Sequence, residues 1–326
     1  MIDRAHHAVI LPIASSAQRP RWSVLIPTFN CALYLENALE SVLAQDLGPE
    51  EMEIIVVDDH STEDDPEAVV NRVGRERVRF IRQLRNVGKV GNYESGLLAS
   101  RGHLIHQLHG DDRVLPGFYQ SMGQAFDSFP RAGAVFCEAN YIDENGRISG
   151  RTGRIQLEAG LLDGWLEKLV ISQRIQTPSI AVRREVYEST GGFDRRLDAV
   201  EDWEMWIRIA TRFQFAFLPL TLADYRVSSH NNTARTMRSG SRAKTLRRML
   251  QIVDGYLPAE LVARTRVERR RELAQTFIQF IPLLMSQREF RGVARTYRDA
   301  LSFSHDLKTC YRLLSYTRNY RKLLAA

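Results

Sequence analysis

Hydrophobic and polar positions fall into alternating blocks along the first third of the chain. Short, continuously apolar runs predict four strands, at residues 22–28, 52–61, 78–83 and 103–112. Apolar residues at helical spacing predict helices between them, at 31–45, 64–73 and 91–100, and Asn30 is the expected N-cap of the first. This alternation indicates βαβ units and a mostly parallel sheet that is covered by helices on both faces.

Polar residues stand at the carboxyl end of each predicted strand. They are Thr28 and Asn30, Asp58 and Asp59, Arg85 and Asn86, and Asp111 and Asp112. Ligands of open α/β sheets bind at this edge, so we expect these side chains to line one crevice. The last pair directly follows an apolar run, and isolated buried charge is costly. Either the chain leaves the sheet there in a polar loop, or the two carboxylates hold a cation.

The regular alternation weakens after residue 130. The pattern then predicts a strand and turn at 134–147, a strand running into a helix at 179–190, and a helix at the end of 191–213. That last helix places Trp203, Trp206 and Ile207 on one side. We expect an N-terminal tail over 1–20, an α/β domain over 21–233 and a helical C-terminal region over 234–326.

The charge is distributed unevenly between these regions. Residues 235–326 contain 20 Lys and Arg against 7 Asp and Glu, which leaves 25 basic and 32 acidic residues in the remainder. Apolar residues at helical intervals predict two to four helices there: Leu273, Phe277, Ile281, Leu284, Phe290, Val293 and Tyr297. Their basic face is either solvated or rests on anionic lipid. Nucleic acid is not the expected partner, because no nucleic-acid-binding module is recognisable.

Composition narrows the class of protein further. At 44% hydrophobic and 26% charged residues the chain is typical of globular proteins, and no apolar run approaches the ~18 residues that span a bilayer. The three cysteines, Cys31, Cys137 and Cys310, are far apart and form no C-x-x-C pair. They predict neither a zinc site nor a disulfide framework and favour a reducing compartment. We expect a cytoplasmic protein, peripheral at the inner face of the cell membrane.

Seven short motifs occur in a fixed order over residues 22–233. They are VLIPTFN, IIVVDDHSTEDD, RNVGKVGNYESGL, LHGDD, GGFD, EDWEMWIR and YR. In this order they resemble glycosyltransferase family 2, a group of inverting enzymes. The resemblance implies an α/β fold of GT-A type, with a mostly parallel, Rossmann-like sheet flanked by helices, to which this chain adds a C-terminal helical appendage. It also implies a nucleotide-diphosphate sugar as donor, with a UDP-sugar favoured.

The resemblance assigns the strand ends to the donor. Base and ribose would be held by Pro27, Thr28, Asn30, Asp58 and Asp59, and carboxylates can accept from uracil N3–H or ribose hydroxyls. The alternative for the two aspartates is a helix N-cap beside a solvated acid. Further donor contacts would come from Arg85, Gly88, Lys89 and Asn92. The alternative there is solvated basic residues around a glycine turn, and the segment is not a P-loop because no Gly-Lys-Ser/Thr ending is present.

The resemblance also implies a divalent cation, Mg²⁺ or Mn²⁺. Many family members have Asp-x-Asp where this chain has His109-Gly110-Asp111, so Asp111 is the expected metal ligand. His109 either bonds ribose or phosphate or is a structural strand-end histidine, and Asp112 caps the following loop. Family members often carry a histidine two residues after the arginine of the YR motif. Here Ser228 stands there, so either His230 takes the metal role or that role is lost.

The acceptor side would lie around EDWEMWIR. By resemblance Asp202 is the general base, with Glu201 a weaker candidate and Trp203 lining the acceptor pocket. The alternative is that both acids only complement a helix dipole. Gly191 and Gly192 would form the loop where donor and acceptor meet.

These residues predict an inverting, metal-assisted transfer to a hydroxyl of a glycan or lipid-linked saccharide, in cell-envelope or exopolysaccharide synthesis. The alternative is a catalytically silent family member that acts as a nucleotide-sugar-binding or scaffold subunit. A Rossmann dehydrogenase is disfavoured, because no G-x-G-x-x-G follows the first strand.

Overall fold

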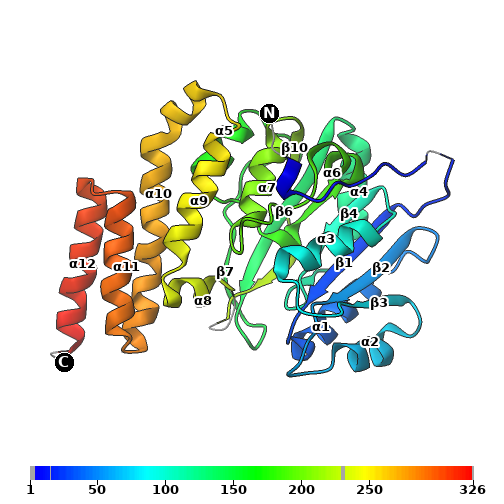
Figure 1. Ribbon diagram of the computed structural model, residues 1–326, viewed down its shortest axis with the longest axis horizontal. Helices are drawn as coiled ribbons and strands as arrows, with labels where there is room; N and C mark the ends of the chain where they lie inside the picture. Colours follow the sequence, from blue (N-terminus) through cyan, green and yellow to red (C-terminus); the bar gives the residue numbers. More distant parts are fainter. Residues whose placement is uncertain (1–3, 15, 229–231, 325–326) are drawn as a thin grey trace. The chain divides into compact units, whose positions relative to one another are not determined.

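The computed structural model divides the chain into two compact units (Figure 1). The first contains Met1–Trp165 and Arg174–Ser228, and the second contains Leu166–Gln173 and Ser229–Ala326. The structure describes residues 4–14, 16–228 and 232–324, with residues 4, 232 and 316–324 described by their backbone alone. The predicted boundary at 233/234 lies close to this division, but a helical segment before residue 174 also joins the second unit.

A single twisted sheet forms the centre of the first unit. Its order is β3 (Val78–Arg82), β2 (Met52–Asp58), β1 (Trp22–Thr28), β4 (Leu104–Gln107), β9 (Ile180–Arg183), β6 (Ala132–Ile142), β10 (Gln214–Arg226) and β5 (Arg113–Val114). Two short strands, β7 (Ile148–Arg151) and β8 (Gly160–Leu161), pair with β6 and β10. The first four strands are mutually parallel, as are β6 and β10, while β9 runs antiparallel to both its neighbours. The predicted α/β fold is confirmed, with a mixed half added to the parallel one.

Helices cover the sheet, and all of them except the fourth, at 118–128, lie where the apolar spacing predicts a helix. They are α1 (Ala32–Leu43), α2 (Pro66–Gly74), α3 (Lys89–Ala99), α4 (Phe118–Ser128), α6 (Arg184–Thr190) and α7 (Glu201–Ala210). Strand residues such as Val24, Ile26 and Val56 are fully buried against α1, in line with helices on both faces. The N-cap prediction is wrong: Cys31 precedes α1, and Asn30 instead accepts hydrogen bonds from the Thr62 and Glu63 amides.

Part of the predicted N-terminal tail packs against the first unit. Ala8 and Ile10 are buried, and the Ala8 amide donates to Glu94 Oε1 on α3 at 2.9 Å. The Gly192 amide donates to the Ala8 carbonyl at 2.9 Å. Residues 7–10 therefore form an N-terminal strap that contacts both α3 and the loop around Gly192. The sequence of this short segment does not predict these contacts.

The second unit is helical. Beyond part of α5 (Trp165–Ile171) it contains α8 (Asn232–Ser239), α9 (Arg242–Asp254), α10 (Ala259–Ser286), α11 (Phe290–Phe303) and α12 (Leu307–Leu324). Five described helices thus follow residue 231, where the pattern predicted two to four. Sharp turns divide them, at Gly240 with φ 78° and at Arg288 with φ 59°. No helix among the described residues is long and apolar enough to cross a membrane.

Candidate active site

The carboxyl ends of β1, β2 and β4 meet at one edge of the sheet. The Asp59 amide donates to the Thr28 carbonyl at 3.0 Å, and the Gly110 amide donates to the Pro27 carbonyl at 3.0 Å. A Cβ on Gly110 would lie 3.0 Å from Cys31 Sγ, so only glycine fits this close approach without a shift. The predicted strand-end residues therefore do lie together, as parallel strands require.

Asp58 and Asp59 are both buried, so neither is the solvated loop acid of the alternative reading. Asp58 accepts from the Ser61 amide at 3.2 Å and lies 3.5 Å from Arg82 Nε. Asp59 Oδ1 accepts from the Val87 amide at 2.7 Å, and burial raises the pKa of its carboxyl. The N-cap of α2 is Asp65, so the helix-cap alternative is also wrong for this pair.

The LHGDD stretch gathers three groups that can bind a cation. Ligand atoms of His109, Asp111 and Asp112 all lie within 4.8 Å of one another. Asp112 Oδ1 accepts from the Arg226 amide at 2.8 Å, while its Oδ2 is buried and has no hydrogen-bond partner among the described residues. Burial raises the pKa of both carboxyls, and for Asp112 the neighbouring Asp111 raises it further. A cation bound here would stabilise the ionised form of both carboxyl groups.

His109 is a neutral imidazole in this setting. Burial, and then the charge of Lys89, lower its pKa to about 3. Its Nδ1 lies 3.7 Å from Asp112 Oδ2, and a neutral ring nitrogen is a common metal ligand. The donor set of two carboxylates and one imidazole therefore fits a divalent cation. His230, the other predicted ligand, lies outside the described residues.

Tyr93 connects this cluster with the acceptor-side motif, and the sequence prediction missed it. Its ring stacks on His109 with centroids 5.3 Å apart, and its hydroxyl lies 2.9 Å from His109 Nε2. Burial, and then four surrounding carboxylates, raise its pKa well above 10.0; the carboxylates are those of Glu201, Asp202, Asp111 and Asp112. The only signal in the sequence is that this tyrosine belongs to RNVGKVGNYESGL.

Arg226 of the YR motif is a second residue whose role the sequence did not reveal. Its Nε donates to the Asp111 carbonyl at 2.8 Å, and its guanidinium lies 4.4 Å from the centre of the Tyr34 ring. Since its own amide binds Asp112, Arg226 holds both aspartates of LHGDD in place.

The two predicted acids at the start of α7 have different surroundings. Glu201 is only 2% exposed, and its Oε1 forms an ion pair with Lys89 Nζ at 2.7 Å. Asp202 is less buried; its Oδ1 accepts from the Trp203 amide at 2.8 Å, and its Oδ2 lies 3.4 Å from Thr177 Oγ1. Val200 before them has φ 61°, a strained conformation for a β-branched residue and a common feature of functional sites.

A comparison with models of known protein families shows to which family the chain belongs. The model described as "Glycosyl transferase family 2" matches residues 23–212, which is more than half of the chain. The chain belongs to glycosyl transferase family 2. As a member of this family it is a glycosyltransferase enzyme that acts on a nucleotide sugar.

The chain is also similar in sequence to individual proteins of other organisms. An uncharacterised protein of Mycobacterium tuberculosis is 28% identical over 259 residues, which cover 76% of this chain and 80% of that protein. A GalNAc(5)-diNAcBac-PP-undecaprenol beta-1,3-glucosyltransferase of Campylobacter jejuni is 36% identical over 108 residues, 32% of this chain and 34% of that protein.

Solved structures of this fold are similar as well. The Pyrobaculum calidifontis mannosyltransferase PcManGT, in complex with GDP-Man and Mn²⁺, has a TM-score of 0.58 at 19% identity, covering 94% of this chain and 83% of that one. S. aureus TarS in complex with UDP-GlcNAc has a TM-score of 0.55 at 16% identity, covering 92% of each chain. At these identities the likeness concerns the fold, which is of GT-A type.

Some residues predicted to bind the donor of this glycosyltransferase are engaged by its own chain. The side-chain amide of Asn92 donates to the Val57 carbonyl at 2.7 Å, and the Asn30 side chain binds the loop after β2. Lys89 pairs with Glu201, and Gly88, with φ 81°, precedes it at the start of α3. Arg85 is exposed and makes no ion pair with the part of the chain that the structure describes. Their donor contacts remain predictions.

The glycine pair of GGFD packs against the N-terminal strap. Both glycines are buried, and a Cβ on Gly191 would lie 3.1 Å from His7 Cβ, while one on Gly192 would lie 3.2 Å from Ala8 Cβ. Glycine is therefore required at both positions because the backbone passes close to the N-terminal strap. The acceptor-side role of the pair stays a prediction.

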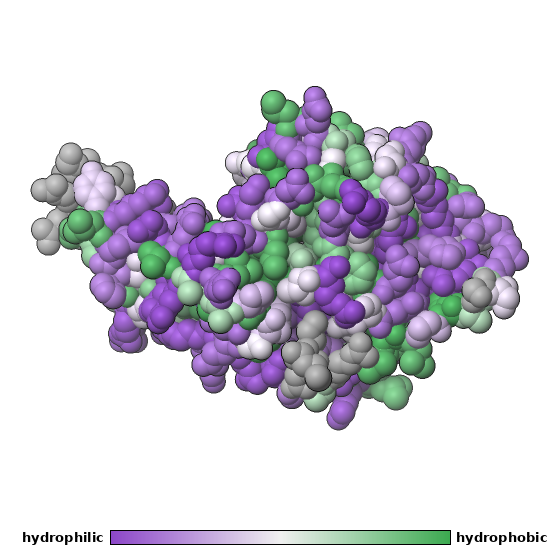
Figure 2. Space-filling view, turned by 90° about the horizontal axis from the view of Figure 1, so that it is seen from above, coloured by the Kyte–Doolittle hydropathy of each residue, from purple (hydrophilic) through white to green (hydrophobic). Residues whose placement is uncertain are grey.

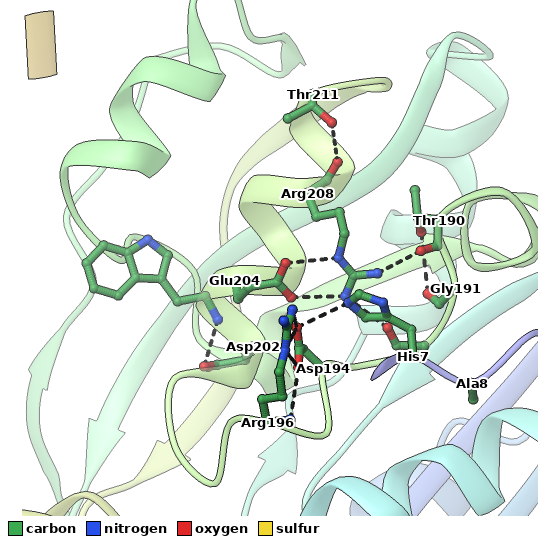
Figure 3. A network of polar contacts seen from close by, with 12 residues as sticks. His7, Ala8, Thr190, Gly191, Asp194, Arg196, Asp202, Glu204, Arg208 and Thr211 are labelled. Atoms are coloured by element: carbon green, nitrogen blue, oxygen red, sulfur yellow. Dashed lines mark hydrogen bonds and ion pairs between the residues drawn. The ribbon is translucent and has the colours of Figure 1, made fainter. Parts of the chain in front are cut away.

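A buried polar network anchors α7, the helix that begins with Glu201 and Asp202 (Figure 3). Arg208 pairs with Glu204 at 3.0 Å, and both side chains are fully buried. The same guanidinium donates to the Thr190 carbonyl at 2.7 Å and to the Gly192 carbonyl at 2.9 Å. Arg208 thereby links α7, which begins with Glu201 and Asp202, to the loop that carries the glycine pair.

Arg208→Met is expected to lower the free energy of unfolding by about 3–5 kcal/mol, because it leaves Glu204 buried beside an apolar side chain. Urea denaturation followed by circular dichroism measures the effect. Arg212→Met is the matched control: Arg212 is exposed and donates only to the Ser189 carbonyl, so a change within about 0.5 kcal/mol is expected. Equal effects of the two variants would contradict this role for the network.

Proposed function

We propose that this glycosyltransferase inverts the anomeric carbon of its donor sugar, with Asp202 as the general base. The observation that carries the proposal is that Tyr93 connects the two acidic motifs: its hydroxyl lies 2.9 Å from His109 Nε2, and carboxylates of both motifs raise its pKa. The ion pair between Lys89 and Glu201, at 2.7 Å, joins the same two sides of the site. These contacts support a site in which donor and acceptor residues act on one bond.

In the proposed reaction Asp202 accepts the proton of the acceptor hydroxyl as that oxygen attacks the anomeric carbon. The bond from this carbon to the diphosphate oxygen breaks, and the electron pair leaves with the diphosphate. Attack comes from the face opposite the leaving group, so the configuration inverts without a covalent intermediate, through a transition state of oxocarbenium character. Lys89 and Arg85 are the cations that we assign to the departing diphosphate.

The candidate metal ligands are His109, Asp111 and Asp112, with His230 proposed from the sequence alone. The buried Asp112 Oδ2, which has no hydrogen-bond partner among the described residues, supports this assignment. A bound Mg²⁺ or Mn²⁺ would neutralise diphosphate charge. Arg226 holds the backbone of Asp111 and the carboxylate of Asp112, so it keeps the ligands in register.

For the substrates we propose a UDP-sugar as donor and a saccharide or lipid-linked saccharide of the cell envelope as acceptor. Structures of similar fold were solved with UDP-GlcNAc or with GDP-Man, and the name of the Campylobacter jejuni relative specifies an undecaprenol-linked acceptor. We also propose that the enzyme works at the cytoplasmic face of the membrane, to which the basic C-terminal region is suited.

Calorimetric titration with UDP, GDP, dTDP and CDP, each with and without Mn²⁺, tests the donor side. We expect one nucleotide, with UDP favoured, to bind at least about tenfold more tightly when Mn²⁺ is present, because the diphosphate and the clustered carboxylates share the cation. If no nucleotide bound in the presence of metal, the proposal would fail, and a silent scaffold subunit would describe the protein better.

A further inference from the structure

The last helix of the second unit has an exposed apolar stripe. Leu307, Tyr311 and Leu314 of α12 are 90%, 72% and 64% exposed. Their spacing of four and three residues places them on one side of the helix. Thr309 and Leu313 lie on the other side and are buried, and the Leu313 carbonyl accepts from the Tyr297 hydroxyl of α11 at 3.0 Å. The stripe therefore faces away from the surface by which α12 packs on its own unit.

Within the unit, α12 lies at the end of a row of helices with α11 and α10 (Figure 1). Single exposed apolar residues are ordinary, but three large ones in successive turns form a patch that calls for a ligand or partner. Green residues also appear among the purple ones over these helices in the space-filling view (Figure 2). The packing inside the unit thus leaves one apolar helix side uncovered.

The charge of the helix specifies what kind of partner fits. Over Leu307–Leu324 the sequence has five basic residues and no acid: Lys308, Arg312, Arg318, Arg321 and Lys322. Lys308 is exposed beside the stripe, whereas the Arg312 guanidinium donates to the Gln275 side chain of α10. Leucine and tyrosine on one side with lysine and arginine around them are typical of helices that lie in the plane of an anionic lipid interface.

We propose that α12 docks on the surface of an anionic lipid bilayer. The side chains of Leu307, Tyr311 and Leu314 enter the boundary between headgroups and acyl chains, and Lys308 contacts lipid phosphates. The helix lies on the membrane and does not cross it, in keeping with the absence of a spanning helix among the residues that the structure describes. The docking is independent of the sugar acceptor, so it can be tested on vesicles that contain none.

Sedimentation with vesicles tests the proposal. The full-length protein is mixed with vesicles of equal parts phosphatidylglycerol and phosphatidylcholine, or of phosphatidylcholine alone. We expect binding to the anionic vesicles, weakened by salt, and little binding to the neutral ones. The triple variant L307S/Y311S/L314S should bind the anionic vesicles at least about tenfold more weakly, since affinity scales with the apolar area buried.

The double variant L84S/L157S is the matched control, because Leu84 and Leu157 are 99% and 81% exposed in the first unit. It should bind the vesicles like the wild type. Far-ultraviolet circular dichroism and nucleotide titration show whether the triple variant is folded. Equal binding of wild type and triple variant, or no binding of wild type to anionic vesicles, would overturn the proposal. Dimers that the triple variant loses in light scattering, without vesicle binding, would instead assign the stripe to a second copy of the chain.

Discussion

Asp202→Asn is expected to lower kcat by about 10²–10⁴-fold, the range that a positioned general base contributes. Asparagine keeps the shape of the side chain and can still interact with the Trp203 amide through its oxygen, but it cannot take the acceptor proton at neutral pH. Donor binding should change little, because the residue acts on the acceptor. The measurements are initial rates of sugar transfer and calorimetric titration of the donor nucleotide.

Asp198→Asn is the matched control for this variant, since Asp198 is an exposed carboxylate in the loop just before α7. Its turnover should stay within about twofold of the wild type, in line with the small effects of surface substitutions. If Asp202→Asn lost donor binding but retained turnover, Asp202 would belong to the donor site and the general base would have to be sought elsewhere.

Asp111→Asn has the second largest expected effect, a fall in kcat/KM of about 10²–10³-fold. Loss of the negative charge weakens the cation site, and a metal supplies several kcal/mol of transition-state stabilisation. The distinguishing readout is the affinity for the nucleotide diphosphate: Mn²⁺ should strengthen it in the wild type and much less in the variant. Titrations with and without Mn²⁺ measure both.

Asp127→Asn provides the comparison for Asp111. Asp127 forms an exposed ion pair with Arg21 at 2.8 Å, and such pairs contribute little. It should leave metal-dependent binding unchanged. An equal loss of nucleotide affinity in Asp111→Asn with and without Mn²⁺ would contradict the metal role and would indicate a direct or structural contact of Asp111.

Local patterns determined the first half of the catalytic unit. The apolar runs of β1 and β2 are buried on both faces, so hydrophobicity alone separates these strands from the helix between them. Because parallel strands end at the same edge, the order of polar residues along the chain also predicted that Thr28, Asp59 and Asp111 would lie near one another. The family motifs supplied the enzyme class, which periodicity cannot.

Only the tertiary structure decided what these residues contact. Lys89 and Glu201 are far apart in sequence, and their ion pair exists because the first turns of α3 and α7 face each other. The same holds for the glycine pair and the N-terminal strap, and for Tyr93 and His109. Helical and strand periodicity reports which side of an element is buried, but it carries no information on the partner. The partner is set by packing between distant segments, and here that packing brings the two acidic motifs together.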